Sequence, residues 1–289
     1  MPFLQSWQCE RFADEGYLLV ENAVDADQVS ALRNQFSDWV EASRQQCRPW
    51  GKTLDGRARF DLEPGHDKDR PALRRVNAPT DISAEYLAAM RDSRIADYVA
   101  ELIGPNVKFH HSKINSKLPG AATAVKWHQD FAFTPHSNDD LVTALLMLDD
   151  LSEENGPLQV LPGSHRGAIY DLWHDGEFTG AIDDDLARDC LARSVSCTGT
   201  AGTLCLMHTR LLHGSAANRS PRPRTLFIVV YSAEDAVPCA PSPVPCRHQG
   251  EVVRGVATGR VRATGYDILL PQMPRSASFF DQQASSGRD

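Results

Sequence analysis

The chain has 289 residues, a formal net charge of −8 and 42% hydrophobic residues, a composition that supports a globular fold with a large core and excludes a disordered chain. The acidic balance disfavours a nucleic-acid partner, because phosphate contacts need clustered cations. No apolar run reaches the roughly 18 residues that cross a bilayer, and the N-terminus lacks the features of a secretory signal, so we expect no membrane segment and a cytoplasmic location.

The first third of the chain reads as helical. Asp25 and Gln28 have the spacing of a capping box, and apolar residues then recur at helical spacing to about residue 46. A second helical stretch covers 83–103 and stops at Gly104-Pro105. Between the two, residues 47–80 are rich in Pro, Gly, Arg and Asp, which predicts a long irregular segment that acts as a lid.

After Pro105 the pattern changes to short apolar runs separated by turn residues, which predicts strands of a β-sandwich or barrel. The expected strands are 107–118, 124–127, 141–148, 158–161, 194–197, 203–207 and 225–232. The insert 170–193 is expected to be a solvated loop with a short helix. The sequence therefore predicts one mainly β domain, with a helical support over 1–105, a β core over 106–235 and an irregular C-terminal cover over 236–289.

One motif near an expected strand points to a metal. His128 and Asp130 flank Gln129, and in extended chain residues two apart project to the same face. A chain of this composition contains about one such pattern by chance, so the motif alone is weak. A second His on a later strand would complete two imidazoles and one carboxylate, the ligand set of non-haem Fe(II) oxygenases.

His213 is the preferred second histidine, and Arg224 follows it by eleven residues. His208 and Arg219 show the same spacing, so His208 remains the alternative ligand. We prefer the first pair because Arg224 enters the expected strand 225–232 in phase with its alternate apolar residues. A guanidinium there could pair with the distal carboxylate of 2-oxoglutarate.

Three blocks, 127–130, 155–167 and 213–220 with Arg224, follow one another in an order that resembles the phytanoyl-CoA dioxygenase (PhyH) family of Fe(II)/2-oxoglutarate-dependent oxygenases. The resemblance covers roughly residues 105–235. It implies a double-stranded β-helix, a cupin-like jelly-roll barrel, with Fe(II) in its mouth and 2-oxoglutarate and O2 as co-substrates.

The resemblance also implies the roles of individual residues. The iron ligands would be His128, Asp130 and His213. Residues around 2-oxoglutarate would be Arg224 and Ser215 at its C5 carboxylate, with Lys117 and Gln129 nearby. Lys117 could instead be an exposed charge at a strand end. Leu146 departs from the pattern, because some members carry a tryptophan there against the co-substrate.

Other residues in these blocks are interpreted as structural. Asn155-Gly156 and Pro162-Gly163 are turn formers, and His165 is expected to be a hydrogen-bonded turn histidine. The seven cysteines are scattered without a C-x-x-C pair, which favours reduced thiols over a disulfide framework.

These features predict a hydroxylating oxygenase. In halogenating relatives a small residue replaces the carboxylate, so Asp130 favours hydroxylation, desaturation or another oxidation. A jelly-roll metal-binding or redox-neutral protein is the alternative, but it would not need the guanidinium of Arg224. A noncatalytic ligand-binding module would be expected to lack a member of the triad, and none is missing.

The expected partner is a small polar or anionic substrate whose identity the sequence does not indicate, and the oligomeric state is equally open. The segment 47–80 is rich in arginine, and three of these residues are candidates for substrate contact: Arg59, Arg74 and Arg75. Barrel residues are the other candidates: His110, His111 and Phe131. His110 and His111 alternate along a strand, so we expect at most one to face the cavity.

Overall fold

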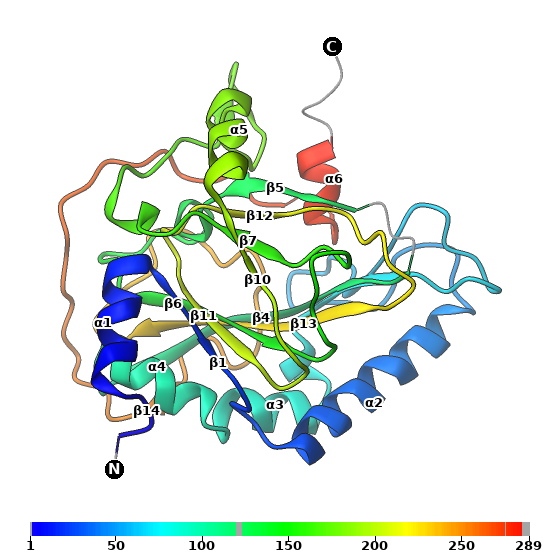
Figure 1. Ribbon diagram of the computed structural model, residues 1–289, viewed down its shortest axis with the longest axis horizontal. Helices are drawn as coiled ribbons and strands as arrows, with labels where there is room; N and C mark the ends of the chain where they lie inside the picture. The colour runs from blue at the N-terminus through cyan, green and yellow to red at the C-terminus, as the bar shows by residue number, and fades with distance from the viewer. Residues whose placement is uncertain (1, 120–122, 275, 285–289) are drawn as a thin grey trace.

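The computed structural model describes residues 2–119, 123–274 and 276–284. Two antiparallel sheets form the body of the molecule (Figure 1). The strands of the major sheet are β1 (Tyr17–Val20), β2 (Phe60–Leu62), β3 (Leu73–Asn77), β4 (Val107–Lys117), β6 (Leu141–Met147), β11 (Leu204–His208), β13 (Arg224–Ala233) and β14 (Val252–Arg254). Their order is β1-β11-β6-β13-β4-β3-β2, with β14 also paired to β4.

The minor sheet lies opposite. Its strands are β5 (Val125–His128), β7 (Leu158–Val160), β10 (Val195–Cys197) and β12 (His213–Ser215), in the order β10-β7-β12-β5. A separate hairpin is formed by β8 (Trp173–His174) and β9 (Glu177–Phe178). The two facing antiparallel sheets make a jelly-roll, which confirms the predicted fold class.

The helices are α1 (Ser6–Glu15), α2 (Ala26–Ser43), α3 (Ala84–Arg91), α4 (Ile95–Ile103), α5 (Asp184–Arg193) and α6 (Phe279–Ala284). Three single 3-10 turns are η1 (Pro79–Asp81), η2 (Asp130–Ala132) and η3 (Ser164–Arg166). As predicted, Asp25 caps α2 by accepting a hydrogen bond from Gln28 N at 2.7 Å. Among the described residues no helix combines the length and apolarity that a membrane span requires.

Residues of the major sheet alternate between two environments. On β6, Leu146 packs with the helices α2–α4, which cover the outer face of the sheet (Figure 1), whereas Leu145 faces the interior between the sheets. On β13, Phe227 and Tyr231 face the helices, and the Tyr231 hydroxyl donates to the carbonyl of Met90 at 2.7 Å. The larger apolar core therefore lies on the helix side, and a second apolar cluster, which includes Leu145, lies between the two sheets.

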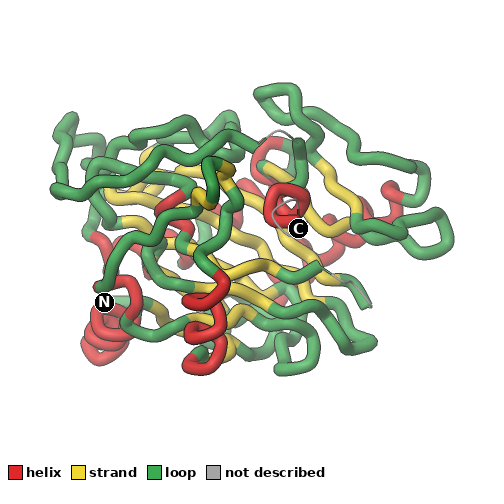
Figure 2. The backbone as a smooth tube through the Cα atoms, turned by 90° about the horizontal axis from the view of Figure 1, so that it is seen from above, coloured by secondary structure: helices red, strands yellow, loops and turns green. Residues whose placement is uncertain are grey.

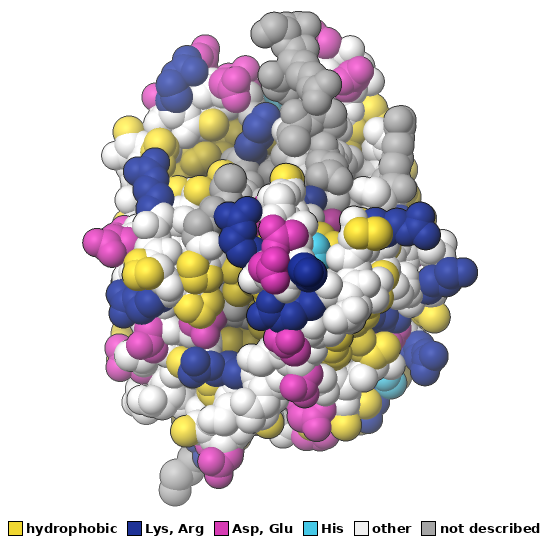
Figure 3. All heavy atoms as spheres, turned by 90° about the vertical axis from the view of Figure 1, so that its right-hand side faces the viewer, with side chains coloured by type: hydrophobic (Ala, Val, Ile, Leu, Met, Phe, Trp, Pro, Cys, Tyr) yellow, Lys and Arg dark blue, Asp and Glu magenta, His cyan; other side chains and the backbone are white. Residues whose placement is uncertain are grey.

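The segment 47–80 differs from its expectation as an irregular lid. It contributes β2 and β3, which extend the major sheet beyond β4. The apolar pattern did not predict these strands because their buried positions include charged residues. Asp61 and Arg74 form an ion pair at 2.7 Å, with side chains 1% and 5% exposed. Figure 3, which faces the right-hand side of Figure 1, shows acidic and basic side chains interspersed over that face.

The chain after β14 runs around the outside as loop before it reaches α6 (Figures 1 and 2). The expected irregular cover over 236–289 thus includes β14 and α6 as well as loop, and its last five residues, 285–289, lie outside the described part of the chain. Gln283 of α6 donates to the carbonyl of Gly180 at 2.8 Å and accepts from Lys126 N at 3.0 Å. The cover is thus fastened beside β5.

Candidate active site

The three expected metal ligands lie together at one end of the minor sheet. His128 and His213 stand opposite each other where β5 pairs with β12. Asp130 follows in η2, directly after β5. One ligand atom from each residue lies within 4.8 Å of the others. Two imidazoles and one carboxylate in this arrangement can hold a divalent metal on one face and leave its other positions open.

Backbone hydrogen bonds fix both rings. Nδ1 of His128 donates to the carbonyl of Lys126 at 2.7 Å, and Nδ1 of His213 donates to the carbonyl of Leu211 at 2.9 Å. Each Nε2 then faces Asp130 Oδ1, at 3.6 Å from His128 and 3.8 Å from His213. These bonds select the tautomer whose free lone pair points to the metal position.

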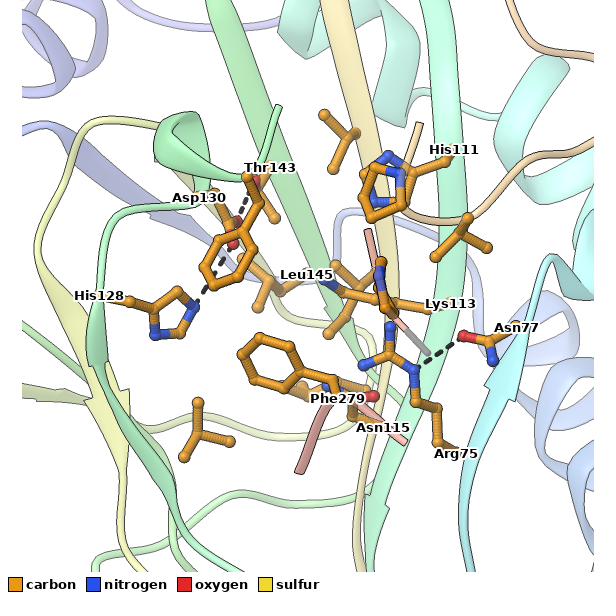
Figure 4. Close-up of a pocket in the computed structure, with 18 of the residues that line it drawn as sticks. Arg75, Asn77, His111, Lys113, Asn115, His128, Asp130, Thr143, Leu145 and Phe279 are labelled. Atoms are coloured by element: carbon orange, nitrogen blue, oxygen red, sulfur yellow. Dashed lines mark hydrogen bonds and ion pairs between the residues drawn. The ribbon is translucent and has the colours of Figure 1, made fainter. Parts of the chain in front are cut away.

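The carboxylate is oriented in the same way. Oδ2 of Asp130 accepts a hydrogen bond from Thr143 Oγ1 at 2.7 Å, which leaves Oδ1 beside the histidines (Figure 4). Burial would raise the pKa of Asp130, but His213, His128 and Lys113 outweigh it and hold this pKa well below its ordinary value. Burial lowers the pKa of His213 to about 4. An ionised carboxylate beside a neutral imidazole suits a cation.

Arg224 lies in the same cavity. It is the first residue of β13, pairs in register with Lys117 of β4, and is 3% exposed. Its Nε is buried and has no hydrogen-bond partner among the described residues. Burial lowers its pKa to about 10, so the guanidinium stays charged near neutral pH. A buried cation without a partner is costly, and a bidentate anionic ligand would satisfy it. The residues present therefore fit a dicarboxylate co-substrate.

Lys117 and Ser215 sit beside this guanidinium. Nζ of Lys117 donates to Ser215 Oγ at 2.7 Å and to the carbonyl of Ala216. Lys117 is 2% exposed, which excludes the alternative of an exposed strand-end charge. Burial, together with the charge of Arg224, lowers its pKa to about 6. Lys117 thus acts as a hydrogen-bond donor that holds Ser215 at the cavity wall.

Gln129 does not reach the cavity. Its amide nitrogen donates to the carbonyls of Ala168 at 3.0 Å and Arg210 at 2.6 Å, and its oxygen accepts from Tyr170 N at 2.8 Å. The side chain therefore fastens two loops behind the metal position. Leu146 is likewise displaced from its expected place, because it packs on the helix side of the sheet; Leu145 lines the cavity instead.

Only some of the candidate substrate residues line the cavity. Arg75 and His111 line the cavity. Arg59 instead donates to the carbonyls of Asn77 and Ala78 at 2.9 and 2.6 Å, and Arg74 pairs with Asp61. Neither of these two guanidinium groups lines the cavity, and that of Arg74 also donates to Ser278 Oγ at 2.6 Å, which ties the sheet edge to the C-terminal segment.

Two barrel candidates also point elsewhere. Phe131 is fully buried and packs edge-on against Tyr266, with ring centroids 5.3 Å apart. His110 lies against His136, with ring centroids 4.9 Å apart, and lines a separate pocket. As expected, only one of the adjacent pair, His111, faces the main cavity. The rejected ligand His208 packs against His165 and Phe12, away from the triad.

Sequence reasoning missed several residues that line the cavity: Lys113, Asn115, Thr143 and Phe279. Two of them belong to a visible pattern, because every second residue of β4 from His111 to Lys117 is polar and faces the cavity or its wall. Phe279 comes from α6, where no local pattern signals a distant cavity. Figure 4 shows it between His128 and Arg75.

Comparisons with known proteins agree with this site. The profile of the phytanoyl-CoA dioxygenase (PhyH) family matches residues 12–226. The chain is 33% identical over 268 residues to a probable alpha-ketoglutarate-dependent hypophosphite dioxygenase from Stutzerimonas stutzeri, a match that covers 91% of this chain and 90% of the relative. It is 27% identical over 253 residues to L-proline trans-4-hydroxylase from Streptomyces griseoviridis, covering 80% and 87%.

A solved structure is similar as well. EctD from S. alaskensis, crystallised with 2-oxoglutarate and 5-hydroxyectoine, has a TM-score of 0.61 and 25% identity, covering 80% of this chain and 77% of that chain. The family profile spans most of the sequence, and the triad and the neighbouring guanidinium meet in one cavity. The chain therefore belongs to the phytanoyl-CoA dioxygenase family and is a non-haem, Fe(II)- and 2-oxoglutarate-dependent dioxygenase that uses O2.

Proposed function

We propose that this enzyme hydroxylates a small polar or anionic molecule and converts 2-oxoglutarate to succinate and CO2. One observation carries the proposal. A single cavity contains the His128, Asp130 and His213 cluster, the guanidinium of Arg224, whose buried Nε has no partner among the described residues, and further cationic side chains on its wall. Such a cavity can hold a metal, a dicarboxylate and a polar substrate side by side.

Each group has a distinct role. His128, Asp130 and His213 would hold Fe(II), which together with 2-oxoglutarate and O2 supplies the oxidising chemistry when bound. Arg224 would bind the far carboxylate of 2-oxoglutarate through paired N–H donors. Ser215, held by Lys117, adds a hydroxyl at the same place.

The apolar part of the wall would restrict water. Leu145, Leu226 and Ile228 line the side of the major sheet, and Phe279 of α6 lies near the metal position, with its ring centroid 5.7 Å from that of His128. Exclusion of water limits loss of oxidising equivalents, and the fixed wall orients one bond of the substrate.

The names of the relatives support a small substrate. They act on hypophosphite, L-proline and ectoine, all of them small molecules with polar groups. The carboxylate of Asp130 fills the third ligand position, which favours hydroxylation over halogenation. The alternative, a redox-neutral metal-binding protein, leaves the buried charge of Arg224 without a purpose.

The test is a screen for substrate-stimulated succinate release. The purified chain with Fe(II), 2-oxoglutarate and O2 is incubated with a panel of small polar and anionic molecules, and hydroxylated product is measured by mass spectrometry. We expect at least one molecule to raise succinate release, with an equal amount of product. Absence of any 2-oxoglutarate consumption by the metal-loaded chain would contradict the proposal. His213→Ala serves as the inactive control.

A further inference from the structure

Two cationic side chains share the cavity wall opposite the metal position. Arg75 lies on β3 and Lys113 on β4, and the two strands are paired so that Asn77 faces Lys113 and Arg75 faces Asn115. Arg75 and Lys113 are therefore diagonal neighbours on the interior face of the sheet. In Figure 4 both project toward the middle of the cavity, across from His128 and Asp130.

Among the described residues, carboxylates act on these two cations only from beyond ion-pair distance, Asp130 on both and Asp61 on Arg75. The guanidinium of Arg75 donates from Nε to the neutral amide oxygen of Asn77 at 2.8 Å and lies over the ring of Phe279. Within the described parts of the chain, no carboxylate pairs with Arg75 or Lys113, and no hydrogen bond reaches the ammonium of Lys113. Beside them, Oδ1 of Asn115 is buried and has no hydrogen-bond partner in the described part of the protein.

Other basic residues of this region are neutralised. Arg57 also lines the cavity, but it pairs with Asp55 at 2.6 Å and donates to the carbonyl of Pro243 at 2.7 Å. Arg74 pairs with Asp61. On the cavity wall, Arg75 thus differs from its arginine-rich neighbours because, within the described residues, it has no carboxylate partner, and the same is true of Lys113.

The formal charges of the site with Fe(II) and 2-oxoglutarate bound leave Arg75 and Lys113 without compensation. Fe(II), the carboxylate of Asp130, doubly charged 2-oxoglutarate and the guanidinium of Arg224 together carry no net charge. Asp130 and the co-substrate then have no negative charge to spare for Arg75 and Lys113. Two like charges held close together and away from bulk solvent repel each other, and an anion placed between them would remove that cost.

We propose that Arg75 and Lys113 form an anion-binding subsite that holds the substrate by a small oxyanion group, either a carboxylate or a phosphonate-type group. This inference rests on the proposed function of the cavity. Because the subsite and the metal position share one cavity, one small substrate can contact both. Paired cations would also orient the substrate, which selective oxidation of one bond requires.

Calorimetry without O2 tests the subsite in the full chain loaded with Fe(II) and saturating 2-oxoglutarate. The probes are propionate, methylphosphonate and, as the uncharged match to propionate, propionamide. The variants are Lys113→Met and Arg75→Gln, with Arg75→Lys as the variant that keeps the charge. Lys108→Met is the control, because Lys108 lies on the same strand but donates to the carbonyl of Ala236 and lines a different pocket.

We expect one of the two anions to bind more tightly than propionamide and so to identify the preferred oxyanion. Lys113→Met and Arg75→Gln should each weaken its binding by about tenfold or more, as loss of a hydrogen bond to a charged group does. Arg75→Lys should lose less affinity for this anion, and Lys108→Met should bind it as tightly as the wild type does.

Three results would overturn the subsite: no binding of either anion, equal binding of propionamide, or unchanged anion affinity in both neutralising variants. Binding of 2-oxoglutarate is measured first in every protein. If the wild type fails to bind it, the proposed function itself fails; if all variants bind it normally, the outcome concerns only Arg75 and Lys113.

Discussion

At the scale of single residues, the direction of a side chain matters more than its type. His213 and His208 have the same spacing to a following arginine, yet only His213 meets His128 and Asp130. The sequence could select it because Arg224 enters its strand in phase, which Arg219 does not. Gln129 shows the limit: a motif places it between two ligands, but backbone carbonyls on two loops decide where it points.

We predict that His213→Ala loses most of the affinity for Fe(II), because the two remaining protein ligands supply one donor atom fewer and no longer define one face of the metal. His208→Ala should bind iron like the wild type, since His208 packs against His165 outside the cavity. Iron content per chain after equilibrium dialysis measures the effect. Normal iron content in His213→Ala, with loss in His208→Ala, would show that the ligand assignment is wrong.

At the scale of elements, a strand can be predicted where its buried face is apolar. The interior face of β4 is polar, but Phe109 and Ile114 on its other face, with the turn residues that flank it, were sufficient. β2 and β3 were missed because the pair Asp61 and Arg74 takes buried positions that pattern reading assigns to apolar residues. Such a pair is visible only once the two strands are adjacent.

That pair makes a stability prediction. Asp61→Asn removes the charge that faces Arg74 at 2.7 Å and should lower the free energy of unfolding by about 3 kcal/mol, because it weakens the compensation of a buried cation. The exposed pair Arg11–Glu15 is the control, and Glu15→Gln should cost less than about 0.5 kcal/mol. Urea unfolding curves give both values. Equal effects of the two substitutions would refute the structural role of the buried pair.

The C-terminal helix α6 contributes Phe279 to the cavity, between His128 and Phe133. We predict that Phe279→Ala admits water and increases the 2-oxoglutarate consumed per product formed, while iron binding is unchanged. Val256→Ala is the control, since Val256 is 66% exposed. The ratio of succinate to hydroxylated product is the measurement, and an unchanged ratio would mean that α6 does not limit access of water.

At the scale of the whole molecule, the apolar runs predicted the strands of a β-sandwich or barrel, and the resemblance to the phytanoyl-CoA dioxygenase family specified a jelly-roll. An irregular cover was expected, but the place where it docks was not predictable, since α6 is held by contacts far apart in the sequence, such as Gln283 with Gly180. Cavity residues supplied by such segments have no local signature.

Buried neutral histidines should make the whole fold sensitive to acid. Burial lowers the pKa of His136 to about 4 and that of His110 to about 3. Both pKa values lie below that of a histidine in the unfolded chain, which is about 6.5. The unfolded chain therefore takes up protons first as the pH falls. Stability that is present at neutral pH is then lost below about pH 6.5, by about 2 kcal/mol per histidine between roughly pH 7 and pH 5.

Thermal unfolding of the metal-free chain at these two pH values checks this prediction. His136→Asn is the matched variant, because its amide can still donate to the carbonyl of Thr134, which Nδ1 of His136 reaches at 2.8 Å, but does not titrate. Its melting temperature should fall less on acidification than that of the wild type. The same fall in both proteins would contradict the role of His136.

The central claim is that one cavity holds Fe(II) at the triad and 2-oxoglutarate at Arg224. The measurement is a titration of the Fe(II)-loaded chain with 2-oxoglutarate without O2, followed by the visible absorption band that appears when the co-substrate chelates the metal. We predict saturation in the wild type at one 2-oxoglutarate per iron, and a requirement about tenfold or more higher in Arg224→Ala, with Arg224→Lys in between. No band in the wild type, or equal affinity in the wild type and Arg224→Ala, would contradict the claim.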